Sequence, residues 1–438
     1  MLLRLSIKNF LSFYKKVEFD MFPNLKRERF QNHIYTENEI PLLKQAAIYG
    51  YNGSGKSNFI KAVGFLQSFV LNENFLKSID LKDYKFQLVA KNELPVSFEV
   101  EFFYKDKYYI YSTEISEIIS EKLRISNLGE SEDILIFERN GNEIKSPYLQ
   151  NETSSVQLLE MNPKSSLLPL NKQFPILSNL DCNHVFDWFS NQLEIITMNS
   201  IIPMFIEVMS KKPELVNFAN KVFKSINIGV NAIEVSNTPF DKWIHDKKNM
   251  QHIENMMEQE VPNPKKTLSI IENKINLFNV SIDKGMRVVQ EFMFEQLGQS
   301  GYKKKMKIAS QSDGTIRILT LIPAIYDAMK NQKVVFIDEI ENSIHPNLMF
   351  ALIKYYSQND SNGQLIFTTH STHLLNQQVL IRPDEVWLTE KEEGNSKMYS
   401  LNDYKIHHTI NIENGYLDGR YGGTSMVSEI GNNGYIGK

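Results

Sequence analysis

The first seventy residues read as a strand, a glycine-rich loop and a helix. Leu2 to Phe10 alternates between apolar and polar positions, as a strand does, and Val17 to Phe19 fits a partner strand after a short turn. The short apolar run Gln45 to Tyr49 ends at Gly50, and apolar residues at helical spacing follow from Lys56 through Phe69. This order predicts a buried strand that leads through a glycine turn into a helix.

A β pattern follows. Val96 to Phe103 and Tyr108 to Ile115 are joined across the turn Lys105-Asp106, and Ile134 to Phe137 precedes a further turn at Asn140-Gly141. We expect these hairpins to form an antiparallel lobe beside the glycine-rich loop.

The middle of the chain has the helical period. Apolar positions three and four residues apart recur in His184 to Met198, Ile202 to Ile226 and Ser269 to Phe278. We therefore expect a mainly helical insertion over residues 131–284. It separates a first part of the main domain, residues 1–130, from a second part, residues 285–438.

The last part of the chain alternates buried strands and helices. The expected helices are Ile316 to Met329 and Met349 to Tyr356, and the expected strands are Val334 to Ile337, Leu365 to Thr368 and Val386 to Leu388. Alternation of β and α elements predicts an α/β fold with a mainly parallel core sheet that is covered on both faces.

Composition narrows the class of protein. The 438 residues are 42% hydrophobic and 23% charged, which is typical of a globular chain. The net charge of -4 gives no global basic field for nucleic acid or an anionic membrane. Cys182 is the single cysteine, so a disulfide framework and a paired-cysteine zinc site are excluded. Without a signal-peptide pattern or a long apolar stretch, we expect a soluble cytoplasmic protein without membrane contact.

The loop between the first buried strand and its helix carries the clearest chemistry. Residues 50–57 match G-x-x-x-x-G-K-[ST] at every fixed position, in the strand-loop-helix context that this motif requires. Backbone N–H groups of such a loop point at phosphate oxygens, Lys56 bridges the β- and γ-phosphates, and the Ser57 hydroxyl ligates Mg²⁺. ATP and Mg²⁺ are the predicted cofactors. The predicted ATP-binding residues here are Asn52, Gly53, Ser54, Gly55, Lys56, Ser57 and Asn58.

Two later strands end in polar residues. Val334 to Ile337 runs into Asp338, predicted to hold Mg²⁺, and Glu339, predicted to take a proton from the attacking water. The next buried strand closes on His370, which can hydrogen-bond the γ-phosphate and that water. Together with Lys56, Glu339 and His370 are the predicted catalytic residues.

A short motif precedes the helix that starts near Ile316. Ser312-Asp313-Gly314-Thr315 lies at the helix N-terminus, where a hydroxyl and free N–H groups suit a γ-phosphate. The same residues would also serve as an ordinary helix cap. We predict that Ser312 and Gly314 bind nucleotide.

These motifs, in this order, resemble the ABC-type ATPase heads of SMC proteins, RecF and the overcoming-lysogenization-defect proteins. The resemblance covers roughly residues 1–125 and 285–438. It includes the opening residues 7–13, the N-G-S-G-K-S-N loop, residues 338–346 as Walker B and D-loop, and His370 as switch histidine. Residues 312–315 are similar to the signature, with Asp313 in place of the usual first glycine. The family also implies a Q-loop glutamine that ligates the metal, for which Gln87 is the first candidate and Gln67 the second.

The resemblance also implies partners. In this family the signature of one protomer completes the ATP site of the other, so a homodimer with sandwiched ATP, or a higher homo-oligomer, is expected. The chain lacks long coiled-coil arms, and the 68 residues after His370 are too few for a Toprim nuclease domain. It is most similar to compact ATPases of bacterial abortive-infection and anti-phage systems, related to the ATPase subunits of PARIS, Septu and certain retrons. This implies an infection sensor that responds to a phage-derived trigger and controls a separate toxic effector, commonly a nuclease.

Two other functions stay open at this point. The chain can be a RecF-like repair ATPase that binds DNA, for which the lysine run at residues 303–307 is a candidate contact, although such runs more often form solvated strand edges. It can also be a nuclease itself. The acidic and imidazole candidates for that site are Asp187, His184, His245, His407 and His408, and they show no recognised metal-binding spacing.

Overall fold

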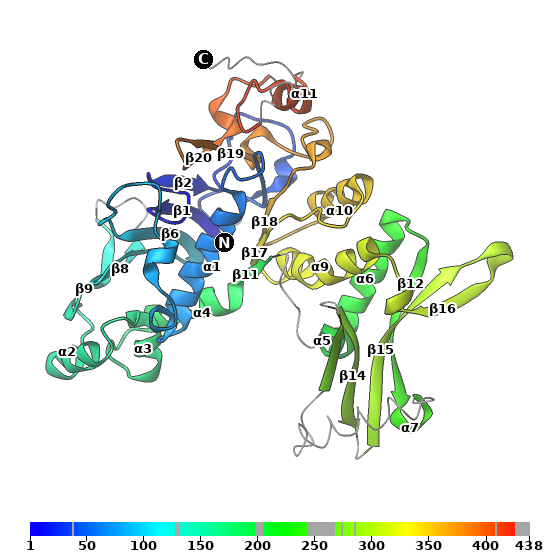
Figure 1. The fold of residues 1–438 in the computed structure, drawn as a ribbon, viewed down its shortest axis with the longest axis horizontal. Coiled ribbons are helices and arrows are strands. Elements are labelled where there is room, and N and C mark those ends of the chain that lie inside the picture. Colours follow the sequence, from blue (N-terminus) through cyan, green and yellow to red (C-terminus); the bar gives the residue numbers. More distant parts are fainter. Residues whose placement is uncertain are drawn as a thin grey trace. The chain divides into compact units, whose positions relative to one another are not determined.

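The computed structural model describes two compact units (Figure 1). The described residues are 1–36, 39–127, 129, 132–197, 205–243, 268–272, 275–283, 286–407 and 410–424. The first unit comprises Met1–Ile195, Ala328–Ile340 and Asp360–Lys438, and the second comprises Ile196–Asp327 and Glu341–Asn359. The second unit thus begins well after residue 131 and extends past residue 284, the bounds expected for the insertion. Within the described residues, no helix has the length and apolar character needed to cross a bilayer.

A six-stranded sheet forms the centre of the first unit. Its order is β11 (Leu193–Ile196), β17 (Val334–Ile337), β18 (Gln364–Thr368), β5 (Gln45–Tyr49), β19 (Val386–Glu392) and β20 (Asn395–Ser400). Strands β17, β18, β5 and β19 pair in parallel, and β20 pairs antiparallel to β19. Every residue of β5, β17 and β18 is buried, as expected for parallel strands covered on both faces. The predicted mainly parallel core sheet is confirmed.

A second sheet of the first unit is wholly antiparallel. Its seven strands run in the order β10 (Glu143–Lys145), β9 (Ile134–Asn140), β8 (Ile119–Ser126), β7 (Lys107–Ile115), β6 (Val96–Tyr104), β1 (Leu2–Lys8) and β2 (Val17–Asp20). The predicted antiparallel lobe is confirmed, and β8 is an addition that the sequence analysis did not identify. One face of the sheet packs on the helix after the glycine-rich loop, α1 (Lys56–Leu71), where the rings of Phe65 and Phe98 stack 5.7 Å apart.

Short helices complete this lobe. They are α2 (Glu152–Met161), α3 (Leu167–Gln173) and α4 (Leu180–Asp187), followed by a π-helical turn over Trp188–Gln192. Trp188 stacks on Phe102 of β6 with ring centroids 4.0 Å apart. Cys182 of α4 is buried, and this burial raises the pKa of its thiol to about 12, so the group stays protonated at neutral pH. The single cysteine therefore acts as a packing residue.

The second unit combines helices with a further antiparallel sheet. The strands β12 (Val230–Pro239), β15 (Met286–Leu297), β14 (Ile275–Asp283) and β13 (Leu268–Glu272) pair in that order, and β16 (Lys303–Lys307) pairs with β15. The helices are α5 (Phe205–Lys211), α6 (Pro213–Ile226), the short α7 (Phe240–Trp243), α9 (Asp313–Lys330) and α10 (Pro346–Gln358), although α9 ends in the first unit.

Two secondary-structure predictions for the middle of the chain are wrong. His184 to Met198 was expected to be helical, but Leu193–Ile196 forms strand β11. Ser269 to Phe278 was expected to be helical, but its described residues, 269–272 and 275–278, belong to strands β13 and β14, which pair with each other. The segment is rich in isoleucine, whose branched side chain fits a pleated surface, and short apolar runs do not distinguish a buried helix from a strand by spacing alone. The helical expectation for Ile202 to Ile226 agrees with α5 and α6 over its described residues.

Candidate nucleotide-binding site

The glycine-rich loop leaves the carboxyl end of β5 in a conformation that needs its glycines. Gly50, Gly53 and Gly55 have φ values of 155°, 85° and 124°. A Cβ on Gly50 would lie 2.3 Å from the Thr389 hydroxyl oxygen, and one on Gly55 would lie 2.5 Å from the Ser396 hydroxyl oxygen. Side chains at these positions would displace the strands behind the loop, so the loop keeps its tight curl only with glycine.

Strands β19 and β20 hold the loop from behind. The Thr389 hydroxyl donates to the Tyr49 carbonyl at 3.1 Å and lies 2.6 Å from the Ser54 hydroxyl. The Ser396 hydroxyl lies 2.6 Å from the Ser54 carbonyl. Thus the loop is fixed by the C-terminal strands before any ligand arrives, which is the pre-organisation that phosphate binding requires.

Lys56 begins α1 and stays at the loop. Its ammonium donates to the carbonyl of Gly50 at 2.7 Å and to that of Tyr51 at 3.4 Å, and the side chain is only 5% exposed. The cap residue of α1 is Gly55, so no side chain caps the helix N-terminus. A helix N-terminus, uncapped by a side chain and joined to a buried ammonium group, suits an anionic phosphate chain.

Asp338 follows β17 at the same edge of the sheet. Its Oδ1 accepts hydrogen bonds from the Ser57 hydroxyl at 3.2 Å and from the Thr368 hydroxyl at 2.7 Å. The structure therefore brings together Ser57 and Asp338, which are 281 positions apart in the sequence. A hydroxyl and a carboxylate in contact are the oxygen ligands that Mg²⁺ prefers, so these residues fit the implied ion.

Glu339 and His370 belong to the same edge. The backbone N–H of Glu339 donates to the Thr368 hydroxyl at 2.7 Å, and Glu339 adopts a left-handed φ of 48°. This conformation is costly for a residue other than glycine, and it marks a position at which the surrounding structure fixes the backbone. His370 is exposed two residues beyond the end of β18, the strand between β17 and β5. The segments after β17, β18 and β5 lie at one edge of the sheet because these strands are parallel.

The predicted signature residues lie in the second unit. Ser312 caps α9, since its hydroxyl oxygen accepts from the Thr315 N–H at 3.2 Å, and Ile316 N–H donates to the Ser312 carbonyl at 3.0 Å. This is the ordinary cap that the sequence also allowed. A Cβ on Gly314 would lie 2.9 Å from the Ser343 carbonyl oxygen, so the start of α9 packs closely on residues of the predicted D-loop. Nucleotide binding by Ser312 and Gly314 stays a prediction.

The two glutamines proposed for the Q-loop have local partners. Gln87 is exposed, and its side-chain amide donates to the carbonyls of Lys82 and Lys85. Gln67 of α1 donates to the carbonyls of Phe189 and Leu193, at 2.8 and 2.9 Å. Thus Gln67 anchors α1 to the π-helical turn. Metal binding by Gln87 stays a prediction, and its contacts with the Lys82 and Lys85 carbonyls do not support it.

Several residues of the site were missed by the sequence analysis. Thr368 bridges Asp338 and Glu339, and the run Thr368-Thr369-His370 at the end of a buried strand was the available signal. The C-terminal helix α11 (Ile412–Leu417) is another case. Tyr416 packs edge-on against Tyr49, and Glu413 accepts from the Thr372 hydroxyl at 2.7 Å. The tail therefore connects the end of β5 with the segment after His370.

The residues considered for a nuclease site are not arranged as a metal site within the described part of the chain. Within the described residues, no group of three or more His, Cys, Asp or Glu side chains is placed to hold a metal ion. The His184 ring lies 3.1 Å from the Tyr109 hydroxyl and 3.7 Å from the Asp181 carboxylate. His245 and His408 lie outside the described residues. These contacts give no support to a nuclease site.

The lysine run lies on β16, at the edge of the second unit's sheet. Three of its members form ion pairs with glutamates of neighbouring strands: Lys303 with Glu295, Lys305 with Glu234, and Lys307 with Glu291. The run is thus a largely neutralised strand edge rather than a free cationic strip.

The sequence profile of one protein family matches residues 46–376. That family is described as "AAA domain, putative AbiEii toxin, Type IV TA system". The chain belongs to this AAA family. The matched span includes the glycine-rich loop, Asp338, Glu339 and His370, whereas α11 lies beyond it. Membership in the AAA family implies nucleotide binding, in agreement with the geometry of the loop.

The solved structures similar to this AAA-family chain include SMC heads at low identity. One is an Smc head bound to the C-winged helix domain of ScpA, with 14% identity over 92% of this chain and 99% of that chain, and a TM-score of 0.48. Another is the SMC head domain from Thermotoga maritima, with 12% identity over 91% and 98%, and a TM-score of 0.43. A third, from Pyrococcus furiosus, is an Smc head with an extended coiled coil, with 14% identity over 96% and 98%, and a TM-score of 0.40. Comparison with curated proteins finds no significant match.

Proposed function

We propose that this protein binds and hydrolyses ATP with Mg²⁺ at the carboxyl edge of the central parallel sheet. The observation that carries the proposal is the contact between Ser57 and Asp338, made beside a loop whose three glycines have positive φ. The contact places an Mg²⁺-type pair of oxygen ligands next to a phosphate-type loop, and the AAA family membership supports the same reading.

The residues divide the chemistry among them. Backbone N–H groups of the loop and the Lys56 ammonium hold the β- and γ-phosphates and stabilise the charge that develops on them. Ser57 and Asp338 would hold the ion, which would supply positive charge to neutralise the phosphate oxygens. Glu339 takes the proton of the attacking water, and His370 donates a hydrogen bond that orients this water against the γ-phosphate. The left-handed φ of Glu339 and the hydrogen bond from its N–H to the Thr368 hydroxyl hold its backbone in place at the end of β17.

We extend the proposal to an ABC-type assembly. Ser312 of one protomer completes the ATP site of a second protomer, and the two heads separate after hydrolysis. Support comes from the order of motifs along the chain and from the close packing of Gly314 on Ser343, which ties the proposed signature to the segment after Glu339. Association of the two heads with ATP and their separation after hydrolysis give the protein two states, and a partner protein can bind one of them preferentially.

The proposed biological role is the regulation of a separate toxic effector in bacterial anti-phage defence. The similarity of the motifs to compact defence ATPases supports this role, and the family description names a type IV toxin–antitoxin system. The alternative of DNA repair depends on basic contacts, and the lysine run on which it rested is paired with glutamates. DNA that stimulates turnover in a salt-dependent manner would favour repair instead.

The test uses Glu339→Gln, with Glu143→Gln on an exposed strand as the matched control. We expect Glu339→Gln to lower ATP turnover by about 10²–10⁴-fold while it keeps nucleotide affinity, because the loss of a general base removes only the proton transfer. With ATP and Mg²⁺, this variant should accumulate as a dimer or larger species in light scattering. Unchanged turnover would remove Glu339 from the mechanism, and an ATP-independent mass would contradict head pairing.

A further inference from the structure

A cavity of about 430 Å³ lies in the first unit, between the segment after β2 and the segments that precede β19 and follow β20. Four of its lining residues are permanent cations, Lys26, Arg27, Arg29 and Arg382, and Glu28 is the single acidic one among them. Such an excess of positive charge is unexpected in a chain whose net charge is -4. It is the kind of local field that recruits an anion.

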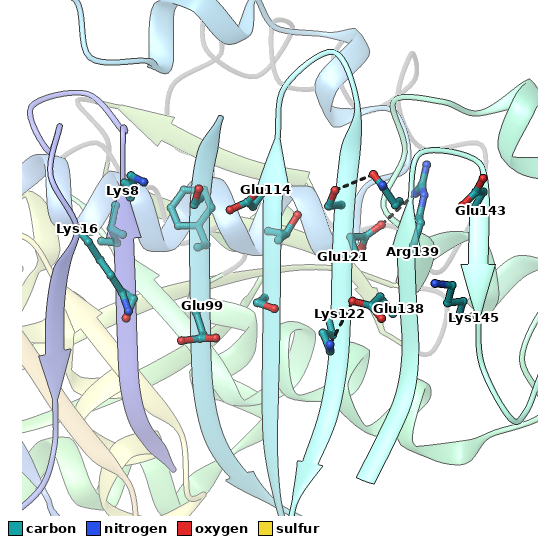
Figure 2. A pocket seen from close by; sticks show the side chains of 18 residues that line it. Lys8, Lys16, Glu99, Glu114, Glu121, Lys122, Glu138, Arg139, Glu143 and Lys145 are labelled. Carbon is teal, nitrogen blue, oxygen red and sulfur yellow. Dashed lines mark hydrogen bonds and ion pairs between the residues drawn. The ribbon is translucent and has the colours of Figure 1, made fainter. Parts of the chain in front are cut away.

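A larger cavity of about 630 Å³ provides the contrast. It is lined by strands of the seven-stranded sheet, and Figure 2 shows its lysine and glutamate side chains side by side on neighbouring strands. Five basic and five acidic side chains line it. Lys122 pairs with Glu138 at 3.1 Å, and Arg139 pairs with Glu121 at 3.0 Å. Charge is balanced within that cavity, so it shows no preference for an anion.

The cationic segment of the smaller cavity is clamped in place by Arg382. This side chain is 1% exposed, and it forms two bonds with the Asp384 carboxylate, at 2.8 and 2.9 Å. It also donates to the carbonyls of Arg29 at 2.7 Å and Asn24 at 3.0 Å. Thus Arg382 is already neutralised and acts as a support. The segment that carries the other cations is pre-organised, which lowers the entropic cost of binding.

The three remaining cations have less compensation than Arg382, although the Asp384 carboxylate also attracts the charge of Arg27. Within the described residues, neither Lys26, Arg27 nor Arg29 forms an ion pair with a carboxylate. Arg27 is half-buried and donates to neutral oxygens, the Asn402 amide oxygen at 3.1 Å and the Ile406 carbonyl at 3.4 Å. Its burial lowers the pKa of the guanidinium, which is the signature of a cation whose hydration has been removed without full replacement.

The rest of the lining is apolar and limits the size of the ligand. Phe30, Ile381, Pro383 and Ile406 contribute to the walls. A cavity of this volume accepts a small organic ligand, and apolar walls beside a cationic rim suit a planar base that carries a phosphate. An extended nucleic acid would need a basic track beyond the cavity. Three of the four lysines in the lysine run are paired with glutamates, and the larger cavity is charge-balanced.

We propose that this cavity is a second anion site, separate from the glycine-rich loop, which binds a small phosphate-bearing ligand of mononucleotide size. Arg27 and Arg29 contact the phosphate, Lys26 adds charge at the rim, and the apolar walls hold the base. The site is independent of ATP hydrolysis by the first site, so the two proposals can fail separately.

The experiment measures binding of AMP, GMP and inorganic phosphate by isothermal titration calorimetry to the full chain that carries Lys56→Ala. This background weakens the glycine-rich loop, so the remaining binding reports on the second site. The test variant adds Lys26→Gln and Arg29→Gln, both on exposed side chains. The control adds Lys77→Gln and Lys91→Gln, which remove the same charge at exposed positions elsewhere in the unit.

We expect one saturable site per chain for a mononucleotide, with affinity that falls at least about tenfold in the test variant and stays unchanged in the control. Weaker binding of phosphate alone would reflect the lost contribution of the base. If none of the three probes binds, or if both variants bind alike, the proposal is wrong. Binding only to single-stranded oligonucleotides, lost in the test variant, would overturn the small-ligand assignment in favour of nucleic acid.

Discussion

Two buried carboxylates of the first unit, Glu121 and Asp338, have different surroundings. Those of Glu121 give it a structural role, and those of Asp338 suit it to bind a cation. Glu121 is 1% exposed and accepts from four groups, the Arg139 guanidinium, the Tyr111 and Ser166 hydroxyls, and the Leu167 N–H, at 2.7–3.0 Å. Asp338 is 8% exposed, and its described contacts are two hydroxyls, those of Ser57 and Thr368. A guanidinium neutralises the first carboxylate, whereas the second retains the capacity to bind a cation.

The difference follows from where each group lies in its sheet. Glu121 points from the middle of an antiparallel strand into the packed lobe, where Arg139 of the next strand and the start of α3 surround it. Asp338 lies at the end of a parallel strand, where several chain segments end together and leave polar groups near a loop. Both carboxylates are buried and acidic, so the position of Asp338 at the carboxyl edge of the parallel sheet is what distinguishes the candidate site.

The largest expected effect on stability comes from removing the ion-pair partner of Glu121. Arg139→Met should lower the free energy of unfolding by about 3–5 kcal/mol, because Glu121 stays buried without its countercharge. Lys122→Met is the matched control on the same sheet. It breaks a half-exposed pair with Glu138 and should cost at most about 1 kcal/mol. Urea unfolding followed by circular dichroism measures both, and equal losses would mean that the buried network has no special weight.

The next effect concerns the group that holds Asp338. Thr368→Val keeps the shape of the side chain but removes the hydroxyl that contacts Asp338 and Glu339, so ATP turnover should fall by about 10–100-fold. Thr368→Ser restores the hydroxyl and should recover most of the activity. A steady-state assay of both variants checks this. If valine and serine behave alike, the hydroxyl does not position the site.

The smallest effect is expected at the charged strand edge of the second unit. Lys305→Gln breaks an exposed pair with Glu234 and should change the free energy of unfolding by less than about 1 kcal/mol. ATP turnover should also stay unchanged. A loss of DNA binding in a gel-shift assay with this variant would show instead that the lysine run contacts nucleic acid.

Much of the first unit follows from the sequence alone. The runs Gln45 to Tyr49 and Val334 to Ile337 are strands with those bounds, because continuous apolar runs flanked by glycine or acid residues are typical of buried parallel strands. The motif at residues 50–57 needs fixed spacing, so it can be identified without a fold. Its contact with Asp338, however, depends on strand order, which spacing does not encode.

The second unit was harder to predict. The isoleucine-rich segment around Ile270 and Ile275 fits a helix and a strand equally by spacing, and the neighbouring strands decide between them through tertiary contacts. In the same way, the sequence could not show that Lys303 faces Glu295, or that Arg382 clamps the cationic segment near Arg29. Contacts between distant residues carry this information.

The central claim is that the loop of residues 50–57 grips the triphosphate of ATP. Retention of labelled ATP with Mg²⁺ on a filter tests it directly, with wild type, Lys56→Ala and Lys61→Ala compared at equal folded concentration. Lys61 is an exposed lysine of the same helix, so it controls for charge. We predict that wild type and Lys61→Ala retain ATP with equal affinity and that Lys56→Ala loses at least about tenfold. Folded wild type that retains no ATP, or equal retention by all three proteins, would contradict the account.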